Sequence, residues 1–252
     1  MKRKIGFSFM ITLIFSTILV MQTVHGEATD GTSMLRILHA VPDAPTIDVY
    51  LDNESIAENL SFKNATEYIT VNEGAYEVEI YEAGTKGTNE PLSSISISVR
   101  ANEVYTLLAA NRIENIDLKL VENAMDVPLG QSMVRVGHLS PDTPTIDFVT
   151  GVTTFNSVSF GDVTDYEIVD AGSQSLHIKG DTEATLPLDD IELKQNNIYT
   201  IYALNTNDDL EHIVLVDYTM VPGTLPKTGL GGTASASPNV LPLLIGLGCM
   251  IL

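Results

Sequence analysis

Cysteine and tryptophan are almost absent from this chain of 252 residues. There is no tryptophan, and the single cysteine, Cys249, lies in a C-terminal apolar stretch. The rest of the chain has no thiol, which excludes disulfide bonds, cysteine-ligated zinc and a cysteine nucleophile from any domain it forms. Enzyme motifs are missing too: the sequence has no G-x-S-x-G elbow, H-E-x-x-H pair, Walker loop or G-x-G-x-x-G turn.

Basic residues are also scarce, with 13 Lys and Arg against 33 Asp and Glu and a formal net charge of −20. A surface of this sign repels nucleic acid and anionic lipid head groups. We therefore expect no nucleic-acid partner. The simplest consequence of the charge is solubility and repulsion between copies of the chain.

No apolar run near the N-terminus is long enough to span a membrane. Residues 1–4 are basic apart from the first, the apolar run 5–20 follows, and Val24-His25-Gly26 offers short residues at the usual cleavage spacing. That run falls short of the roughly 20 residues that a spanning helix needs. The order predicts a secretory signal peptide over residues 1–26, cleaved after Gly26.

An internal repeat occupies the middle of the chain. Residues 36–48 read R-I-L-H-A-V-P-D-A-P-T-I-D, and residues 135–147 read R-V-G-H-L-S-P-D-T-P-T-I-D. Eight of these 13 positions are identical at a constant offset of 99. Residues 66–68 (T-E-Y) and 104–106 (V-Y-T) also match residues 164–166 (T-D-Y) and 198–200 (I-Y-T). A tandem duplication follows.

The duplication predicts two domains of roughly 90–100 residues, each large enough for a core of its own. In chain order we expect the signal peptide 1–26, a first repeat 33–125, a linker 126–132, a second repeat 133–220 and a C-terminal segment 221–252. Pro128 and Gly130 mark the linker.

Within each repeat the hydrophobic period is two. Residues 94–99 (S-I-S-I-S-V) alternate strictly, and residues 76–80 (Y-E-V-E-I) place their acids on one face. Such runs recur every 8–12 residues between Gly, Pro, Asn and Asp, which is typical of an all-β sandwich. We predict two tandem antiparallel β-sandwich domains, immunoglobulin-like or transthyretin-like, with about seven strands each and no amphipathic helix.

The repeated string R-x-x-H-x-x-P-D-x-P-x-x-D, which we call the signature, resembles the bacterial family known as domain of unknown function 4397. Two copies in tandem cover nearly all of residues 33–220. The resemblance implies a β-sandwich found in secreted or envelope proteins. It implies no activity.

The histidine and arginine of the signature point in opposite directions. Leu35, Ile37 and His39 share one face of the expected strand, because side chains alternate along it. We expect His39 to be a buried residue that holds the next turn by a hydrogen bond, since a lone imidazole needs neighbours before it acts as a base or ligand. Arg36 lies on the other face. Arg135 and His138 repeat the arrangement.

The aspartates of the signature have a structural interpretation and an alternative. Asp43 lies in a Pro-Asp-Ala-Pro turn, and Asp48 lies inside the next strand, where Arg36 or a backbone amide is its simplest partner. The alternative is a calcium cage formed by these two residues, and by Asp142 and Asp147. Because no D-x-D-x-D-G loop supports calcium, we expect no cofactor and no bound metal.

A short motif follows the second repeat. The residues are Leu225, Pro226, Lys227, Thr228 and Gly229. L-P-x-T-G resembles the sorting signal of Gram-positive sortases, which implies cleavage after Thr228 and its attachment to peptidoglycan. The tail 240–252 is shorter than in that pattern and has no basic stop, and the small residues 231–237 before it also resemble a lipid-anchor signal. Membrane contact is expected only transiently, through the signal peptide and the tail.

Together these features favour a non-enzymatic exported protein of a Gram-positive cell wall, with sortase and peptidoglycan as partners. The two repeats would act as a binding module for an unknown surface ligand or as a spacer. The alternative is a calcium-dependent surface module or a secreted hydrolase of unknown substrate.

Overall fold

The computed structural model describes residues 31–151, 153–179 and 185–220. Every long element in these ranges is a strand, and the helical turns there are two short 3-10 segments, Ile113–Asn115 and Asn207–Asp209. The predicted all-β class is confirmed. The expected signal peptide, residues 1–26, lies outside the described residues.

The first repeat contains eight strands, one more than expected. They are β1 (Thr32–Ala40), β2 (Ile47–Leu51), β3 (Glu54–Leu60), β4 (Ile69–Asn72), β5 (Gly74–Glu82), β6 (Ser93–Val99), β7 (Val104–Ala110) and β8 (Asp117–Asn123). Two four-stranded sheets result, with the orders β3-β2-β5-β6 and β4-β1-β7-β8. All strand pairs are antiparallel except the central pair β1 and β7, which is parallel.

The second repeat has the same plan. Its strands are β9 (Ser132–His138), β10 (Ile146–Thr150), β11 (Thr153–Val158), β12 (Glu167–Val169), β13 (Gly172–Lys179), β14 (Thr185–Leu193), β15 (Asn197–Leu204) and β16 (Glu211–Thr219). The sheet orders are β11-β10-β13-β14 and β12-β9-β15-β16, with β9 and β15 as the parallel pair. The duplication seen in the sequence is thus a duplication of topology.

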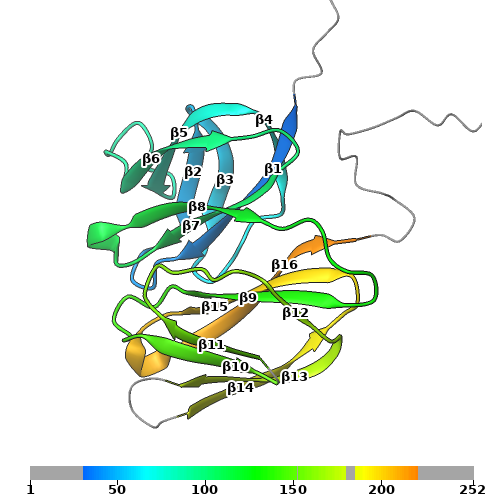
Figure 1. Ribbon diagram of the computed structural model, residues 1–252. Helices are drawn as coiled ribbons and strands as arrows, with labels where there is room; N and C mark the ends of the chain where they lie inside the picture. Colours follow the sequence, from blue (N-terminus) through cyan, green and yellow to red (C-terminus); the bar gives the residue numbers. More distant parts are fainter. Residues whose placement is uncertain (1–30, 152, 180–184, 221–252) are drawn as a thin grey trace, which may run out of the picture.

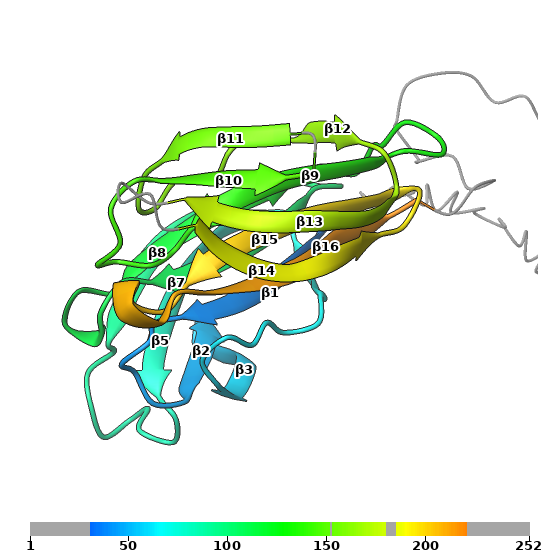
Figure 2. The same cartoon turned by 90° about the horizontal axis from the view of Figure 1, so that it is seen from below.

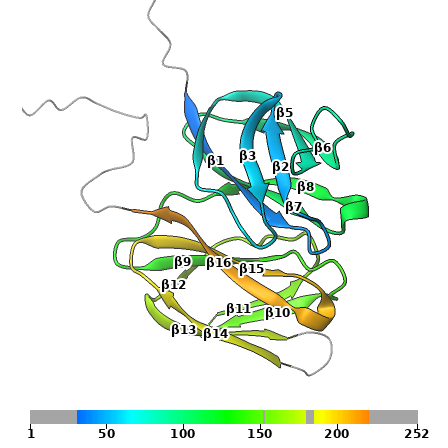
Figure 3. The same cartoon turned by 180° about the vertical axis from the view of Figure 1, so that it is seen from behind.

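The four sheets stack as four layers (Figure 1). The sheets β3-β2-β5-β6 and β11-β10-β13-β14 are the outer layers. The sheets that contain β1 and β9 are the inner layers, and they face each other across the boundary between the repeats, as the views from below and from behind also show (Figures 2 and 3). Each repeat therefore presents its inner sheet to the other.

The burial pattern of the inner strands agrees with this stacking. In β7 and β15 every residue is buried, and β1 is buried at all positions from Leu35 onward. Strands covered on both faces show continuous burial of this kind. In contrast, β6 of an outer sheet alternates, with Ile97 and Val99 inside and serines outside. The inner strands thus separate two apolar regions.

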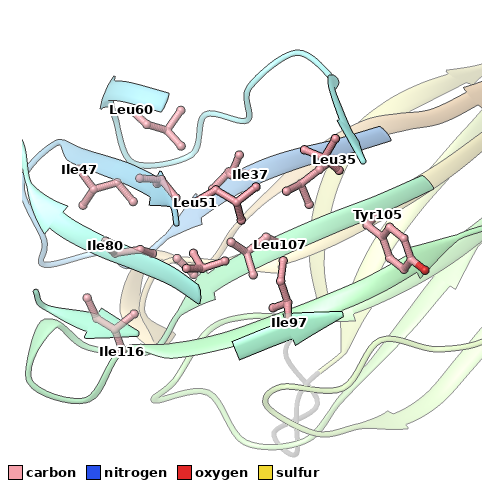
Figure 4. Packing of buried hydrophobic residues seen from close by; sticks show 14 of the residues in the cluster. Leu35, Ile37, Ile47, Leu51, Leu60, Ile80, Ile97, Tyr105, Leu107 and Ile116 are labelled. Atoms are coloured by element: carbon pink, nitrogen blue, oxygen red, sulfur yellow. The ribbon is translucent and has the colours of Figure 1, made fainter. Parts of the chain in front are cut away.

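Each repeat has its own core between its two sheets. In the first repeat, Leu35 and Ile37 of β1 and Leu107 of β7 pack against Ile47 and Ile80 of the outer sheet (Figure 4). In the second repeat, Val134 and Val136 of β9 occupy the equivalent places beside Phe148 and Leu176. Burial of such side chains contributes roughly 1.5–3 kcal/mol each to folding.

Asparagines repeat at the tight turns. Asn102 and Asn196, which precede β7 and β15, have φ angles of 61° and 62°. Asn111 and Asn205, which follow these strands, have φ angles of 81° and 77°. Asparagine tolerates this left-handed region better than most residues, so the same residue type sets the same turn in both repeats.

Candidate functional site

Both signature histidines are fully buried and bound to the backbone of the next turn. Nε2 of His39 lies 3.1 Å from the carbonyl oxygen of Pro45, and Nδ1 accepts a hydrogen bond from the amide of Val41 at 3.2 Å. Because Nδ1 accepts, Nε2 carries the proton of a neutral ring. His138 makes the same two contacts, to Pro144 and Ser140, at 3.1 and 3.2 Å.

The environment of these rings favours the neutral form. Burial lowers the pKa of His39 and of His138, and the hydrogen bonds to backbone carbonyls oppose that shift only in part. The rings also pack edge-on against Phe62 and Phe160. The two histidines therefore fix the turn after the first strand of each repeat.

The signature aspartates inside strands bind backbone amides. Oδ1 of Asp48 accepts a hydrogen bond from the amide of Asn59 and Oδ2 accepts one from Gly84, both at 2.8 Å. Asp147 accepts one from the amide of Ser157 at 2.7 Å. Of the two partners considered for Asp48, the backbone amide is therefore the one present. Arg36 is not its partner.

The turn aspartates of the two repeats share one arginine of the first repeat. Oδ1 of Asp43 accepts a hydrogen bond from the amide of Ile113 at 2.9 Å, and Oδ2 lies 3.7 Å from Nη1 of Arg112. The same arginine donates through Nη2 to Asp142 of the second repeat. Arg112 thus bridges the two copies of the signature. Among the residues that the structure describes, no group of three or more His, Cys, Asp or Glu is placed to hold a metal.

The side chain of Arg36 points away from the core of the first repeat and contacts the second repeat. Its Nη2 donates to Oδ1 of Asp217 in β16, and its Nη1 donates to the carbonyl oxygen of Val216 at 2.8 Å. Its Nε donates to Oγ1 of Thr106 at 3.0 Å. The guanidinium carbon lies 4.9 Å from the ring centroid of Tyr68. The arginine is 4% exposed.

Arg135 makes the reciprocal contacts. Its Nη2 donates to Oδ1 of Asn123 in β8 at 2.5 Å, and its Nη1 donates to the carbonyl oxygen of Glu122 at 2.9 Å. Its Nε donates to Oγ1 of Thr200 at 2.8 Å, and its guanidinium carbon lies 4.3 Å from the ring centroid of Tyr166. The two repeats therefore meet through equivalent residues about a pseudo-twofold axis.

Two further hydrogen bonds close these contacts into a ring. Oγ1 of Thr200 donates to Oδ2 of Asp217, and Nδ2 of Asn123 donates to Oγ1 of Thr106 at 2.8 Å. All six side chains are buried. We call this set the interface ring, and its members in order are Arg36, Asp217, Thr200, Arg135, Asn123 and Thr106. Three residues come from each repeat, so the ring exists only when the repeats are docked.

Two tyrosines flank the interface ring. The hydroxyl of Tyr166 donates to Oδ2 of Asp217 at 2.6 Å, and that of Tyr68 donates to the carbonyl oxygen of Asp217 at 3.1 Å. Burial, the largest cause, raises the pKa of both phenols, and the charge of Asp217 raises it further. Both hydroxyls therefore remain protonated donors.

An apolar cluster completes the contact between the inner sheets. It joins Leu38, Ala40, Leu108 and Ala110 of the first repeat to Leu139, Tyr202 and Leu204 of the second. Leu38 and Ala40 follow Arg36 in β1 at intervals of two, and Tyr202 and Leu204 follow Thr200 in β15 in the same way, so they share strand faces with members of the interface ring. The docked faces are thus both apolar and hydrogen-bonded.

Gly137 and Tyr202, which pair across β9 and β15, fit tightly in this cluster. A Cβ atom on Gly137 would lie 2.6 Å from the ring of Tyr202. We expect Gly137→Ala to lower the free energy of unfolding by about 1–3 kcal/mol, because the ring cannot move in a packed interface. Denaturant unfolding measures the loss.

The double variant Gly137→Ala with Tyr202→Leu is the control, because the smaller leucine leaves room for the added methyl group. The double variant should lose less unfolding free energy than the sum of the losses in the two single variants. Strict additivity would contradict this packing.

A groove of about 560 Å³ opens beside the interface ring. Residues 63–68 form one wall, residues 213–216 of β16 form the other, and Arg36 also lines it. Asn64 and Glu67 are exposed there. At the equivalent place in the second repeat, Lys119 of β8 donates to the carbonyl oxygen of Gly161 at 2.7 Å and bridges the two walls. In the groove beside Arg36, Lys63 likewise bridges the two walls through an ion pair with Glu211 of β16.

Only part of this site could be predicted from the sequence. Arg36 lies on the face of β1 opposite His39, as strand alternation predicts. Asn123 and Asp217 could not be predicted, because they are different residue types at the same position of the two repeats. A comparison of the repeat sequences therefore does not single that position out. The paired Thr106 and Thr200 were visible as part of the repeat, without their role.

The sorting-type motif, residues 225–229, lies outside the described residues. So does the C-terminal tail. Within the ranges that the structure describes, there is no helix long and apolar enough to cross a membrane.

A protein-family model matches both repeats of the chain. The family model described as domain of unknown function DUF4397 matches the chain at residues 33–149 and 132–225. No curated protein matches the chain.

Solved structures give weaker similarity. The carbohydrate-binding module CBMbc of Amy13K from Eubacterium rectale, solved with maltoheptaose, is 11% identical, with 76% of this chain and 98% of that chain covered and a TM-score of 0.24. The tip fimbrial protein Mfa3 from Porphyromonas gingivalis is 8% identical, with 74% and 99% covered and a TM-score of 0.23. A fimbrial assembly protein from Parabacteroides distasonis is 9% identical, with 74% and 98% covered and a TM-score of 0.21. Scores this low do not indicate a shared ligand or role.

Proposed function

Since the chain belongs to the family described as domain of unknown function DUF4397, we propose that it is a non-enzymatic exported surface protein whose two repeats work as one unit. That unit is a binding module or a spacer held at the wall of a Gram-positive cell. The observation that carries the proposal is the interface ring, which is buried and shared equally between the repeats. It turns two small domains into one body.

The signature residues support a structural rather than a catalytic use. His39 and His138 hold turns, and Asp48 and Asp147 accept backbone amides. Arg36 and Arg135 dock the repeats. The resemblance to the DUF4397 signature thus corresponds to a set of folding and docking contacts, which is what a module or spacer requires.

The proposed location of the protein depends on the two signals at its termini. The signal peptide 1–26 would direct export, and sortase would cleave after Thr228 and join it to peptidoglycan. Cell fractionation with mass spectrometry of the mature C-terminus tests this. We expect Thr228 linked to a peptidoglycan peptide. Recovery of an intact chain that ends at Leu252 in the culture medium would contradict wall attachment.

The groove beside the interface ring is the place where a ligand would bind. Its volume is within the range of roughly 300–1,000 Å³ usual for ligand sites, and polar groups line it beside the aromatic ring of Tyr68. We expect the fragment 27–228 to bind a glycan or matrix component in an array screen, and Glu67→Ala to weaken that binding. Asp165→Ala, at the equivalent place in the second repeat, is the matched control. No binder in the screen would favour the spacer.

A further inference from the structure

The faces through which the two repeats dock are equivalent in fold but differ at the charged position of the interface ring. Asn123 of the first repeat stands where the second has Asp217, and each accepts a hydrogen bond from the arginine of the other repeat. The ring therefore buries two guanidinium groups and one carboxylate. The carboxylate belongs to the second repeat and pairs with the arginine of the first.

The apolar parts of the two faces differ in the size of their side chains. Where the first repeat has Ala40 and Ala110, the second has Leu139 and Leu204. Where the first repeat pairs Leu38 with Leu108, the second pairs Gly137 with Tyr202. Side chains are thus small on one face where they are large on the other, and the two faces fill one cluster together.

From these differences we infer that each repeat carries a recognition surface for an unlike repeat of the same fold. The surface of the first repeat fits a partner that supplies a carboxylate to Arg36 and large apolar side chains to the cluster that contains its alanines. Two copies of the first repeat would bury both arginines without a carboxylate, which is costly. Two copies of the second would place two sets of Leu139, Tyr202 and Leu204 in one cluster and overfill it. The repeats are therefore not interchangeable.

The pseudo-twofold axis makes a specific consequence testable. The hydroxyls of Tyr68 and Thr106 accept hydrogen bonds from Nδ2 of Asn123, whereas those of Tyr166 and Thr200 donate to Asp217. A carboxylate at position 123 should serve Arg135 as Asp217 serves Arg36, because a hydroxyl can turn from acceptor to donor when its partner becomes a carboxylate. One carboxylate on either face should then hold the interface together. If Asp217 matters only to its own repeat, a carboxylate on the other repeat cannot replace it.

The experiment compares Asp217→Asn, Asn123→Asp and the double variant in the full chain by thermal unfolding. Asp217→Asn should lower the melting temperature by roughly 6–12 °C, since it leaves two buried arginines without a carboxylate. Adding Asn123→Asp to it should recover at least about half of that loss, because one ion pair is restored. Asp165→Asn removes the same charge at an exposed position, and it should shift the melting temperature by less than about 2 °C.

Two results would overturn the inference. One is a loss in Asp217→Asn that Asn123→Asp leaves uncorrected, and the other is no loss in Asp217→Asn. If Asp217→Asn does not fold, the inference is tested by the double variant and by the single variant Asn123→Asp. Folding of the double variant, with an Asn123→Asp melting temperature at or above that of the natural chain, supports the inference. Failure of both to fold contradicts it.

Discussion

Replacement of Arg36 by methionine is expected to lower the free energy of unfolding by about 3–5 kcal/mol. The change leaves the carboxylate of Asp217 buried at the interface without the guanidinium that pairs with it. It also removes the donor to the carbonyl oxygen of Val216. Such a loss is a large share of the roughly 5–15 kcal/mol by which folded proteins are stable. Denaturant unfolding followed by circular dichroism measures it.

Arg135→Met is the matched control for this prediction. It is as buried as Arg36 and makes the equivalent contacts, but its partner Asn123 is neutral. Removing Arg135 therefore leaves no unpaired charge, only unsatisfied hydrogen-bonding groups, and we expect a smaller loss of about 1–3 kcal/mol. Equal losses in the two variants, or a larger loss for Arg135→Met, would show that the ion pair with Asp217 does not dominate the interface.

Acidification below about pH 6.5 is expected to destabilise the protein through its two signature histidines. Burial lowers the pKa of His39 and of His138 in the folded chain below the usual value of 6.5. As the pH falls, the unfolded chain binds protons that the folded chain does not, so stability decreases. Each histidine contributes at most about 1.4 kcal/mol per pH unit to that slope. The stability that the neutral rings provide is therefore fully present only above about pH 6.5.

Thermal unfolding between pH 5.5 and 7.5 tests the histidine slope. The variant His39→Asn with His138→Asn keeps a side-chain acceptor near the place of Nδ1 but does not titrate. We expect this variant to be less stable throughout and to show a flatter dependence on pH. A slope as steep as that of the natural chain would assign the effect to other groups.

The duplication, the strands and the buried histidines could all be predicted from sequence, because they depend on local pattern. The period-two runs fix which side chains enter each core, and His39 continues the stripe of Leu35 and Ile37. The same alternation contains the docking face, since Arg36 is followed by Leu38 and Ala40. An arginine at the head of an apolar stripe is ambiguous, because long polar side chains also cover exposed surface.

The docking of the repeats was beyond sequence reasoning for a different reason. Its key acceptors, Asn123 and Asp217, lie at the ends of the last strands and differ between the repeats. No local pattern distinguishes them from the many other acidic and amide side chains of this chain. Only the folded arrangement brings Asp217 to Arg36 across 181 residues of sequence.

Differential scanning calorimetry of the fragment 27–228 tests most directly whether the two repeats form one body. The interface ring couples the folding of one repeat to that of the other, so we predict a single transition whose calorimetric and van't Hoff enthalpies agree. Two separate transitions, or a van't Hoff enthalpy near half the calorimetric value, would contradict the account and describe two independent domains on a linker.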